Sequence, residues 1–273
     1  MKVIVRPPGA AFREALSEHP DHDTIDVARA RDQHAAFVTA LRDAGLTLVE
    51  LPTDDALADA CFVSDVLLTL PSAGETGGPA VLALATRPGA SSRRPEVAAV
   101  LEAARALVGP RCEVTAIEEP GTLDAGDVIV FGDRVAVGLS ARTNREGADQ
   151  LARLVAAAGY RPFLCPVEGR LHLASWVTVV RADLLIGVEG GFASLDAAGP
   201  DCAPPDEVGR IVLPWTEVVA ANVLPLGGHV FVPAGNPQAR AALEAAGERV
   251  VEVELSEFTK ADGGPTCLVN HVF

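Results

Sequence analysis

The stretch Asp127-Val-Ile-Val-Phe-Gly-Asp-Arg-Val-Ala-Val137 has the pattern of two short apolar strands on either side of a Gly-Asp turn. Residues 144–158 follow it, and their apolar side chains recur at the spacing of one face of a helix. Gly159 stands where a glycine ends many helices, and residues 160–167 again have the composition of a strand. The segment therefore predicts one unit of strand, strand, helix and strand.

The same order of elements recurs along the chain and predicts a repeated architecture. The most similar copy begins at Asn222-Val-Leu-Pro-Leu-Gly-Gly-His-Val-Phe-Val232, continues as a helix over 237–246 and ends in a strand over 250–253. Two copies with less sequence similarity are also present. One has strands at 66–70 and 81–86, a helix at 94–107 and a strand at 112–117; the other has strands at 177–180, 184–187 and 211–214, with no clear helix over 191–208.

The first unit has only one leading strand, 2–6, before its helix at 25–44 and its strand at 47–51. The last segment, 266–273, predicts a strand that belongs to no unit of its own. If this strand pairs beside strand 2–6, it completes the first unit and closes a ring.

These units together predict an α/β protein, a five-bladed α/β propeller in which each blade is a strand-strand-helix-strand unit. The ring occupies a single domain over 1–273, and an ordinary open α/β sheet is the alternative. Segment 71–80 is rich in Gly and Pro, and segment 189–207 is rich in Gly, Pro and Asp, so we expect both to form surface loops or lids.

The chain is acidic, with 22 Lys and Arg against 37 Asp and Glu in 273 residues and a formal net charge of −15. A nucleic acid is not expected as a partner, because phosphate binding needs a basic surface. No apolar run reaches the length of a membrane span, and the first residues are too short and proline-broken for a signal peptide. Five cysteines without a C-x-x-C pair predict neither a disulfide framework nor a structural zinc site, and they fit a reducing cytoplasm.

Three residues that lie far apart in the sequence could form a nucleophilic set. Cys267 lies in Asp262-Gly-Gly-Pro-Thr-Cys-Leu268, after a tight loop and at the start of the predicted final strand. His172 lies at a loop-to-strand junction, and Asp124 lies between a turn and the first strand of the hairpin. A buried core cysteine, a structural histidine and an aspartate that caps its own turn are the alternatives.

Four further charged residues could hold a charged ligand. Arg93 and Arg142 each follow a turn, and the planar fork of arginine binds a carboxylate through two parallel hydrogen bonds. Asp59 and Asp65 flank an apolar segment and could turn inward toward a cationic ligand. Surface arginines and surface turn aspartates are the alternatives.

Motifs for the common cofactors do not occur in the sequence. Residues 187–191 are not a dinucleotide fingerprint, and there is neither a P-loop nor an H-E-x-x-H motif. We therefore expect no cofactor and no metal. The remaining cysteines are interpreted as core or surface thiols; they are Cys61, Cys112, Cys165 and Cys202.

Eight segments carry a resemblance to a known family through their order and spacing. They are Asp26-Val-Ala-Arg-Ala-Arg-Asp-Gln-His34, Leu51-Pro52, 59–65, Thr86-Arg-Pro-Gly-Ala-Ser-Ser-Arg-Arg94, Thr122-Leu-Asp-Ala-Gly-Asp-Val128, Val137-Gly-Leu-Ser-Ala-Arg-Thr-Asn144, Leu171-His-Leu173 and Thr266-Cys267. The chain resembles the dimethylarginine dimethylaminohydrolases of the guanidine-modifying pentein superfamily over nearly its whole length. The resemblance implies a five-bladed α/β propeller with the active site in its central channel, in agreement with the repeats.

The resemblance also implies the chemistry of the site. Cys267 would be the nucleophile and His172 the general acid and base. Asp124 would bind the substrate guanidinium and orient His172, and Asp65 would hold the guanidinium from another side.

The same resemblance implies contacts to the amino-acid part of a substrate. Arg93 and Arg142 would clamp its α-carboxylate. Asp59 would bind the α-ammonium, together with the backbone carbonyl of Leu16 on an N-terminal lid. The carbonyl of Ala261 would lie near the scissile nitrogen.

The implied reaction is hydrolysis of asymmetric dimethylarginine or monomethylarginine to citrulline plus dimethylamine or methylamine, through a thiouronium on Cys267. The expected partner is this small molecule alone, without nucleic acid or membrane, and the protein would be a monomer or homodimer. Three features depart from the family pattern: Ser64 replaces a common Glu, Ala174 replaces a frequent Lys, and the loop 71–80 is longer. The alternatives are an arginine deiminase-like enzyme, an amidinotransferase and a non-catalytic guanidine-binding propeller.

Overall fold

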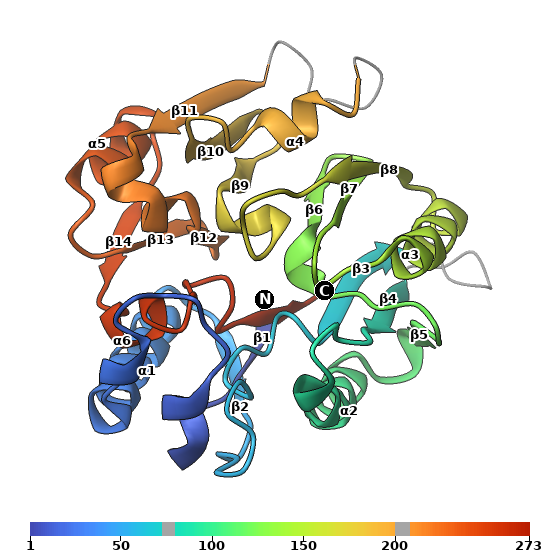
Figure 1. Cartoon of the computed structure of the whole chain (residues 1–273), viewed down its shortest axis with the longest axis horizontal. Helices are drawn as coiled ribbons and strands as arrows, with labels where there is room; N and C mark the ends of the chain where they lie inside the picture. Colours follow the sequence, from blue (N-terminus) through green and yellow to red (C-terminus); the bar gives the residue numbers. More distant parts are fainter. Residues whose placement is uncertain (73–79, 200–207) are drawn as a thin grey trace.

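Five three-stranded sheets stand around a central axis in the computed structural model of the chain (Figure 1). The structure describes residues 1–72, 80–199 and 208–273. Cys202, most of the predicted loop 71–80 and the last part of the predicted loop 189–207 lie outside the described residues. In each sheet the middle strand pairs antiparallel with one neighbour and parallel with the other. The predicted five-bladed α/β propeller is confirmed.

Each sheet and its helix form one blade, and the blades are numbered here by the order of their middle strands. Blade one contains β15 (Asn270–Val272), β1 (Lys2–Val5), α1 (Val27–Asp43) and β2 (Thr47–Glu50). Blade two contains β3 (Leu67–Ser72), β4 (Ala80–Ala85), α2 (Val97–Val108) and β5 (Cys112–Ala116). Blade three contains β6 (Val128–Phe131), β7 (Arg134–Leu139), α3 (Arg145–Ala157) and β8 (Arg161–Pro166).

Blade four contains β9 (Val177–Arg181), β10 (Leu184–Val188), α4 (Ala193–Asp196) and β11 (Gly209–Leu213). Blade five contains β12 (Leu224–Leu226), β13 (His229–Pro233), α5 (Pro237–Ala245) and β14 (Val250–Val253), and the short helix α6 (Ser256–Thr259) follows it. In every blade the helix joins the middle strand to its parallel neighbour, because a parallel pair needs a crossover connection. None of the helices within the described ranges is both long and apolar enough to span a membrane.

Blade three follows directly from its sequence. β6 and β7 pair antiparallel across a turn at Gly132, whose φ of 60° suits a residue without a Cβ. Asn144 caps α3, since its side chain accepts a hydrogen bond from the N–H of Gly147 at 2.8 Å. Gly159 follows the helix with a φ of 93°, which again suits glycine.

Two predicted elements differ from the structure. The helix predicted over 94–107 begins at Val97, after the 3₁₀ turn η3 (Ser91–Glu96), which contains Pro95. Proline lacks the N–H that a regular helix needs. The strand predicted over 266–273 is limited to β15, so Cys267 lies in a turn before the strand. The N–H of Cys267 donates to the carbonyl of Gly264 at 3.1 Å, which is a turn contact and not a strand contact.

The ring is closed by the two ends of the chain. β15 pairs antiparallel with β1, placing Val272 opposite Lys2 and Asn270 opposite Ile4. Both chain ends therefore lie at the same blade, near the middle of the view in Figure 1. The predicted pairing of the final strand with the first is confirmed.

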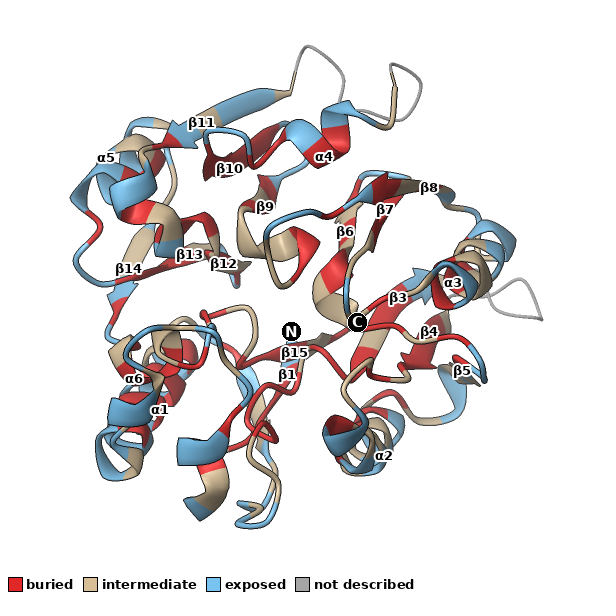
Figure 2. Ribbon diagram, viewed as in Figure 1, coloured by how far each residue is buried: buried red, intermediate tan, exposed pale blue. Residues whose placement is uncertain are grey.

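The apolar core is divided among the contacts between blades, and buried residues concentrate on the strands in Figure 2. Val137 of blade three and Leu84 of blade two, for example, share one cluster with the fully buried Leu151 of α3. Replacing such a leucine by alanine costs about 2–5 kcal/mol. Because each cluster joins neighbouring blades, closing the ring buries the apolar surface on both sides of every blade.

Candidate active site

One cavity collects residues from loops along the whole chain. Its lining includes all nine predicted site residues: Leu16, Asp59, Asp65, Arg93, Asp124, Arg142, His172, Ala261 and Cys267. Four further lining residues were not predicted: Phe62, Leu171, Asp262 and Gly263. Each of the four lies within three positions of a predicted residue, and this closeness in sequence was the available signal.

The Cys267 side chain is held in a tight turn. The N–H of Gly264 points to its Sγ at 3.4 Å. The side-chain oxygen of Asn222, just before β12, accepts hydrogen bonds from the N–H and the hydroxyl of Thr266 at 3.2 and 2.9 Å. Burial and the negative charge of Asp65 raise the pKa of the Cys267 thiol to about 11. Without a ligand, Cys267 is therefore a neutral thiol at neutral pH.

His172 and Asp124 form a buried pair. Nε2 of His172 lies 3.1 Å from Oδ2 of Asp124, and Oδ1 of Asp124 accepts the N–H of Gly89 at 2.9 Å. Burial by itself would lower the pKa of His172, but the hydrogen bond to Asp124 and the charges of Asp65 and Asp127 raise it to about 9. Burial by itself would raise the pKa of Asp124, but the hydrogen bond and charge of His172 lower it. At neutral pH the pair is an imidazolium and a carboxylate.

A glycine allows the histidine ring to approach the carboxylates. Gly126 lies in the turn η5 (Ala125–Asp127), next to the His172 ring. A Cβ at this position would lie 2.6 Å from Nδ1 of His172 and 3.0 Å from Oδ1 of Asp65. The glycine in the sequence motif is therefore required by the close approach of these two side chains.

Arg93 is the centre of a buried charge cluster. Its guanidinium lies 2.7 Å from Oδ2 of Asp65 and 3.0 Å from Oε2 of Glu96, and it donates to the carbonyl of Phe62 at 3.1 Å. Burial raises the pKa of Glu96 to about 7, although Arg93 acts in the opposite direction. Sequence reasoning missed Glu96; its only signal was its place three residues after Arg93.

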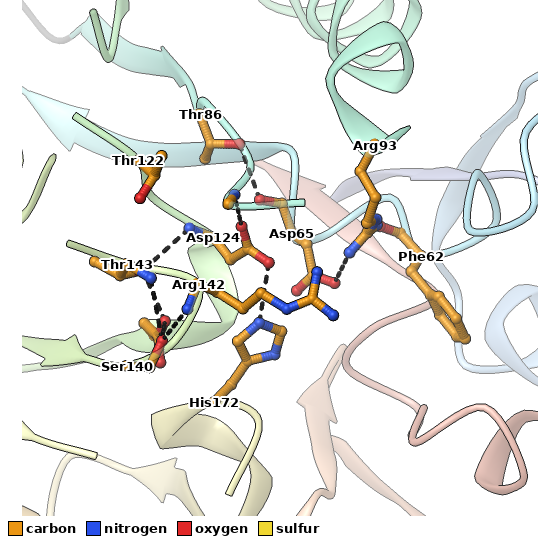
Figure 3. Close-up of polar contacts among 12 residues, drawn as sticks. Phe62, Asp65, Thr86, Arg93, Thr122, Asp124, Ser140, Arg142, Thr143 and His172 are labelled. Atoms are coloured by element: carbon orange, nitrogen blue, oxygen red, sulfur yellow. Dashed lines mark hydrogen bonds and ion pairs between the residues drawn. The ribbon is translucent and has the colours of Figure 1, made fainter. Parts of the chain in front are cut away.

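Arg142 reaches the cavity from a turn after β7. The turn is fixed by the hydroxyl of Ser140, which accepts the N–H of Arg142 at 3.0 Å. Gly89 packs against this backbone so closely that a Cβ there would lie 2.4 Å from the Arg142 carbonyl oxygen. Figure 3 shows the Arg142 side chain extending beside Asp124 and His172. Within the described part of the chain its guanidinium forms no ion pair with a carboxylate.

The N-terminal segment covers another part of the cavity. The N–H of Leu16 donates to Oδ1 of Asp59 at 3.1 Å, and burial raises the pKa of Asp59. Oδ2 of Asp262 accepts the hydroxyl of Ser17 at 2.8 Å and the N–H of Glu18 at 2.9 Å. The segment that follows η1 (Ala10–Glu14) is thus attached to the loop that carries Cys267.

The described residues contain no group of three or more His, Cys, Asp or Glu side chains placed to hold a metal ion.

The fold and the site together define an α/β-propeller enzyme of the pentein superfamily. Residues 9–184 match the profile of a family described as N,N dimethylarginine dimethylhydrolase, eukaryotic. N(G),N(G)-dimethylarginine dimethylaminohydrolase from Pseudomonas aeruginosa is 33% identical over 269 residues, covering 97% of each chain. The enzyme of the same name from Streptomyces coelicolor is 35% identical over 268 residues, covering 98% of this chain and 95% of that one.

The solved structures agree with these relatives. A variant of the Pseudomonas aeruginosa enzyme complexed with citrulline superimposes with a TM-score of 0.85 at 30% identity, covering 98% of this chain and 97% of that one. The chain belongs to the dimethylarginine dimethylaminohydrolase family. The resemblance drawn from the eight sequence segments is confirmed.

Proposed function

We propose that the protein hydrolyses asymmetric dimethylarginine and monomethylarginine to L-citrulline plus dimethylamine or methylamine, with Cys267 as the nucleophile. The observation that carries the proposal is the buried pair of His172 and Asp124 in the same cavity as Cys267. The relative solved in complex with citrulline supports it, because citrulline is the product expected here.

The carboxylates of the cavity suit a guanidinium. Asp65 and Asp124 would flank the guanidinium group, and their charges would keep it protonated. The Ala261 carbonyl would lie near the nitrogen that leaves. These contacts would fix Cζ of the substrate in front of the Cys267 sulfur, which is the positioning that a poor electrophile requires.

The other end of the cavity suits the amino-acid group. Arg142 would bind the α-carboxylate, with Arg93 beside it. Asp59 would bind the α-ammonium together with the backbone carbonyl of Leu16. The hydrogen bond from the Leu16 N–H to Asp59 already brings this segment to the carboxylate.

Substrate binding would activate the nucleophile. His172 is protonated below a pKa of about 9, so it cannot accept the proton of the Cys267 thiol at neutral pH. A bound guanidinium adds a positive charge beside Asp65, whose negative charge is one cause of the raised pKa of Cys267. The cation therefore favours the thiolate, and the thiol proton passes to solvent. The sulfur then attacks Cζ and forms a tetrahedral adduct.

His172 would act first as an acid and then as a base. It donates its proton to the departing amine as the C–N bond breaks, which leaves a thiouronium on Cys267. Neutral His172 then takes a proton from water, and the resulting hydroxide attacks the same carbon. As the C–S bond breaks, the new hydroxyl loses its proton to solvent, so that citrulline and the thiolate are released. The ureido group of citrulline carries no charge, so it is no longer attracted to the carboxylates.

We further propose that residues 1–273 form a single domain that acts in the cytoplasm as a monomer or homodimer, without nucleic-acid or membrane partners. The formal net charge of −15 supports the absence of a nucleic-acid partner. Cys61, Cys112, Cys165 and Cys267 are free thiols, which fits a reducing compartment.

Citrulline release from asymmetric dimethylarginine, monomethylarginine and arginine tests the proposal. We expect turnover of the two methylated substrates, loss of turnover in Cys267→Ser, and retained turnover in Cys112→Ser, a partly buried thiol on β5 away from the cavity. Turnover of arginine alone would indicate a deiminase. Amidino transfer to an added amine would indicate a transferase, and no turnover at all would favour a binding protein.

Ser64 provides a further test of substrate choice. It stands where the family commonly has Glu, and its backbone N–H donates to the Cys267 carbonyl at 3.3 Å. We expect Ser64→Glu to change the ratio of kcat/KM between dimethylarginine and monomethylarginine, because it adds a carboxylate next to Asp65.

A further inference from the structure

Asp127 is a buried carboxylate that the reaction above does not use. It is the last residue of η5, three positions after Asp124, and its exposed fraction is 0%. A buried carboxylate is costly unless its oxygens are hydrogen-bonded. The Asp127 carboxylate accepts three hydrogen bonds, and they connect it to separate parts of the active site.

The first connection leads to His172. Oδ1 of Asp127 accepts the backbone N–H of Leu173 at 3.0 Å. Leu173 follows His172 directly and begins the turn η6 (Leu173–Ser175). The carboxylate therefore fixes the backbone from which the histidine side chain extends.

The second connection leads to Arg142. Oδ2 of Asp127 accepts the hydroxyls of Ser140 at 2.6 Å and of Thr143 at 2.7 Å. The Ser140 oxygen in turn accepts the backbone N–H groups of Arg142 at 3.0 Å and of Thr143 at 3.1 Å. The turn that presents Arg142 is thus closed on the same carboxylate.

The third connection leads to Asp124. The Thr143 hydroxyl that donates to Asp127 also accepts the backbone N–H of Asp124 at 3.2 Å. Asp124 contacts His172 through its side chain, so the network returns to the histidine. A hydroxyl with one donor and two acceptor positions makes both of these bonds at once.

We propose that Asp127 is a positioning residue that holds His172, Asp124 and Arg142 in one fixed arrangement. The part of this inference that concerns turnover rests on the proposed hydrolase function. Asp127 also places a negative charge near the imidazolium, in addition to those of Asp124 and Asp65. A residue that only completed the fold would affect stability without affecting the titration of His172 or the use of substrate.

Asp127→Asn tests the inference, because asparagine keeps the shape and removes the charge. We expect kcat on dimethylarginine to fall at least about 10-fold and the alkaline limb of its pH profile to move down by about one pH unit. Asp133→Asn is the matched control, because Asp133 lies in the exposed turn of the same hairpin and pairs with Arg161. This substitution should leave kcat and the pH profile unchanged. A lowered Tm with kcat and pH profile equal to those of the wild type would overturn the inference.

The titration of His172 measured by NMR keeps this test separate from the hydrolase proposal. We expect Asp127→Asn to lower the pKa of the His172 imidazole, with the signal assigned by its loss in His172→Gln. If the wild type releases no citrulline but this shift is observed, the proposed function fails and the positioning role stands. If the titration is the same in both proteins, the positioning role fails.

Substitutions of the Thr143 and Ser140 hydroxyls test the connections to Asp124 and to Arg142 one at a time. Thr143→Val removes the link between Asp127 and Asp124, and we expect kcat to fall about 10-fold, with Thr143→Ser restoring it. Ser140→Ala loosens the Arg142 turn, and we expect KM for dimethylarginine to rise about 10-fold, with no change for an N,N-dimethyl-N′-alkylguanidine that lacks the carboxylate. Equal effects of Ser140→Ala on both substrates would contradict the assigned connection to Arg142.

Discussion

Arg93 and Arg142 line the same cavity but are held in opposite ways. Arg93 is buried, and its guanidinium forms ion pairs with Asp65 at 2.7 Å and Glu96 at 3.0 Å. Arg142 is partly buried; among the described residues Ser140 holds its backbone N–H, and its guanidinium forms no ion pair. The two arginines have the same implied role, but they differ in their ion pairs. Carboxylates of the protein neutralise the Arg93 guanidinium, whereas the Arg142 guanidinium has no such partner among the described residues. Arg93 therefore stabilises the buried cluster of the site, and we expect the positive charge of Arg142 to be available to a ligand.

The largest effect is expected for Arg93→Ala. The free energy of unfolding should fall by about 3–5 kcal/mol, because Asp65 and Glu96 would remain buried without their partner. Urea unfolding measures this change. Arg153→Ala, an exposed arginine on α3, is the control and should change stability by less than about 0.5 kcal/mol. Equal urea midpoints for Arg93→Ala and wild type would mean that the buried cluster does not stabilise the fold.

Arg142→Ala should affect binding and leave the fold nearly unchanged. We expect KM for dimethylarginine to rise about 30- to 150-fold, equivalent to about 2–3 kcal/mol, because a charge-assisted contact to the α-carboxylate is lost. Steady-state kinetics and urea unfolding on the same sample measure both properties. A carboxylate-free dimethylguanidine is the matched substrate and should show no change. A loss of stability as large as that of Arg93→Ala would remove the distinction between the two arginines.

Glu96→Gln should have the smallest effect, and that effect should depend on pH. Burial raises the pKa of Glu96 to about 7 from 4.5, so the folded state holds this proton more tightly than the unfolded state. The stability of the wild type relative to Glu96→Gln should therefore decrease as pH rises from about 4.5 to about 7, by on the order of 2 kcal/mol. Urea unfolding at several pH values measures it, with Glu102→Gln on the exposed side of α2 as the control. If the stability of the wild type relative to Glu96→Gln instead increased with pH, folding would lower the pKa of Glu96 and not raise it.

The fold could be predicted because its signals are local. Gly132, Asn144 and Gly159 set the turn, the start and the end of elements in blade three, and the same pattern recurs in the other blades. The pairing of the final strand was predicted because the first unit has one leading strand where the other units have two. Its start was placed too early, because the backbone hydrogen bond between Cys267 and Gly264 has no signature in apolar periodicity.

Nine of the residues that line the cavity could be predicted from motifs, but the residues that hold them in place could not. Glu96, Asp127 and Asn222 are ordinary polar residues in sequence. Asp127 and Asn222 have partners in other segments, as when the Asn222 side chain holds Thr266 from 44 positions away. Such contacts depend on how blades meet in space, which neither spacing nor composition encodes. The roles implied for the nine predicted residues remain predictions for the experiments above.

The closing strand also determines when the protein can first work during its synthesis. Cys267 is translated after all five helices of the blades, and β15, which pairs with the earliest strand β1, follows it by three residues. A nascent chain therefore has the carboxylates and His172 of the cavity long before it has Cys267, the nucleophile proposed above. Closure of the ring and completion of the cavity around Cys267 therefore fall at the same stage of translation, after the five blade helices.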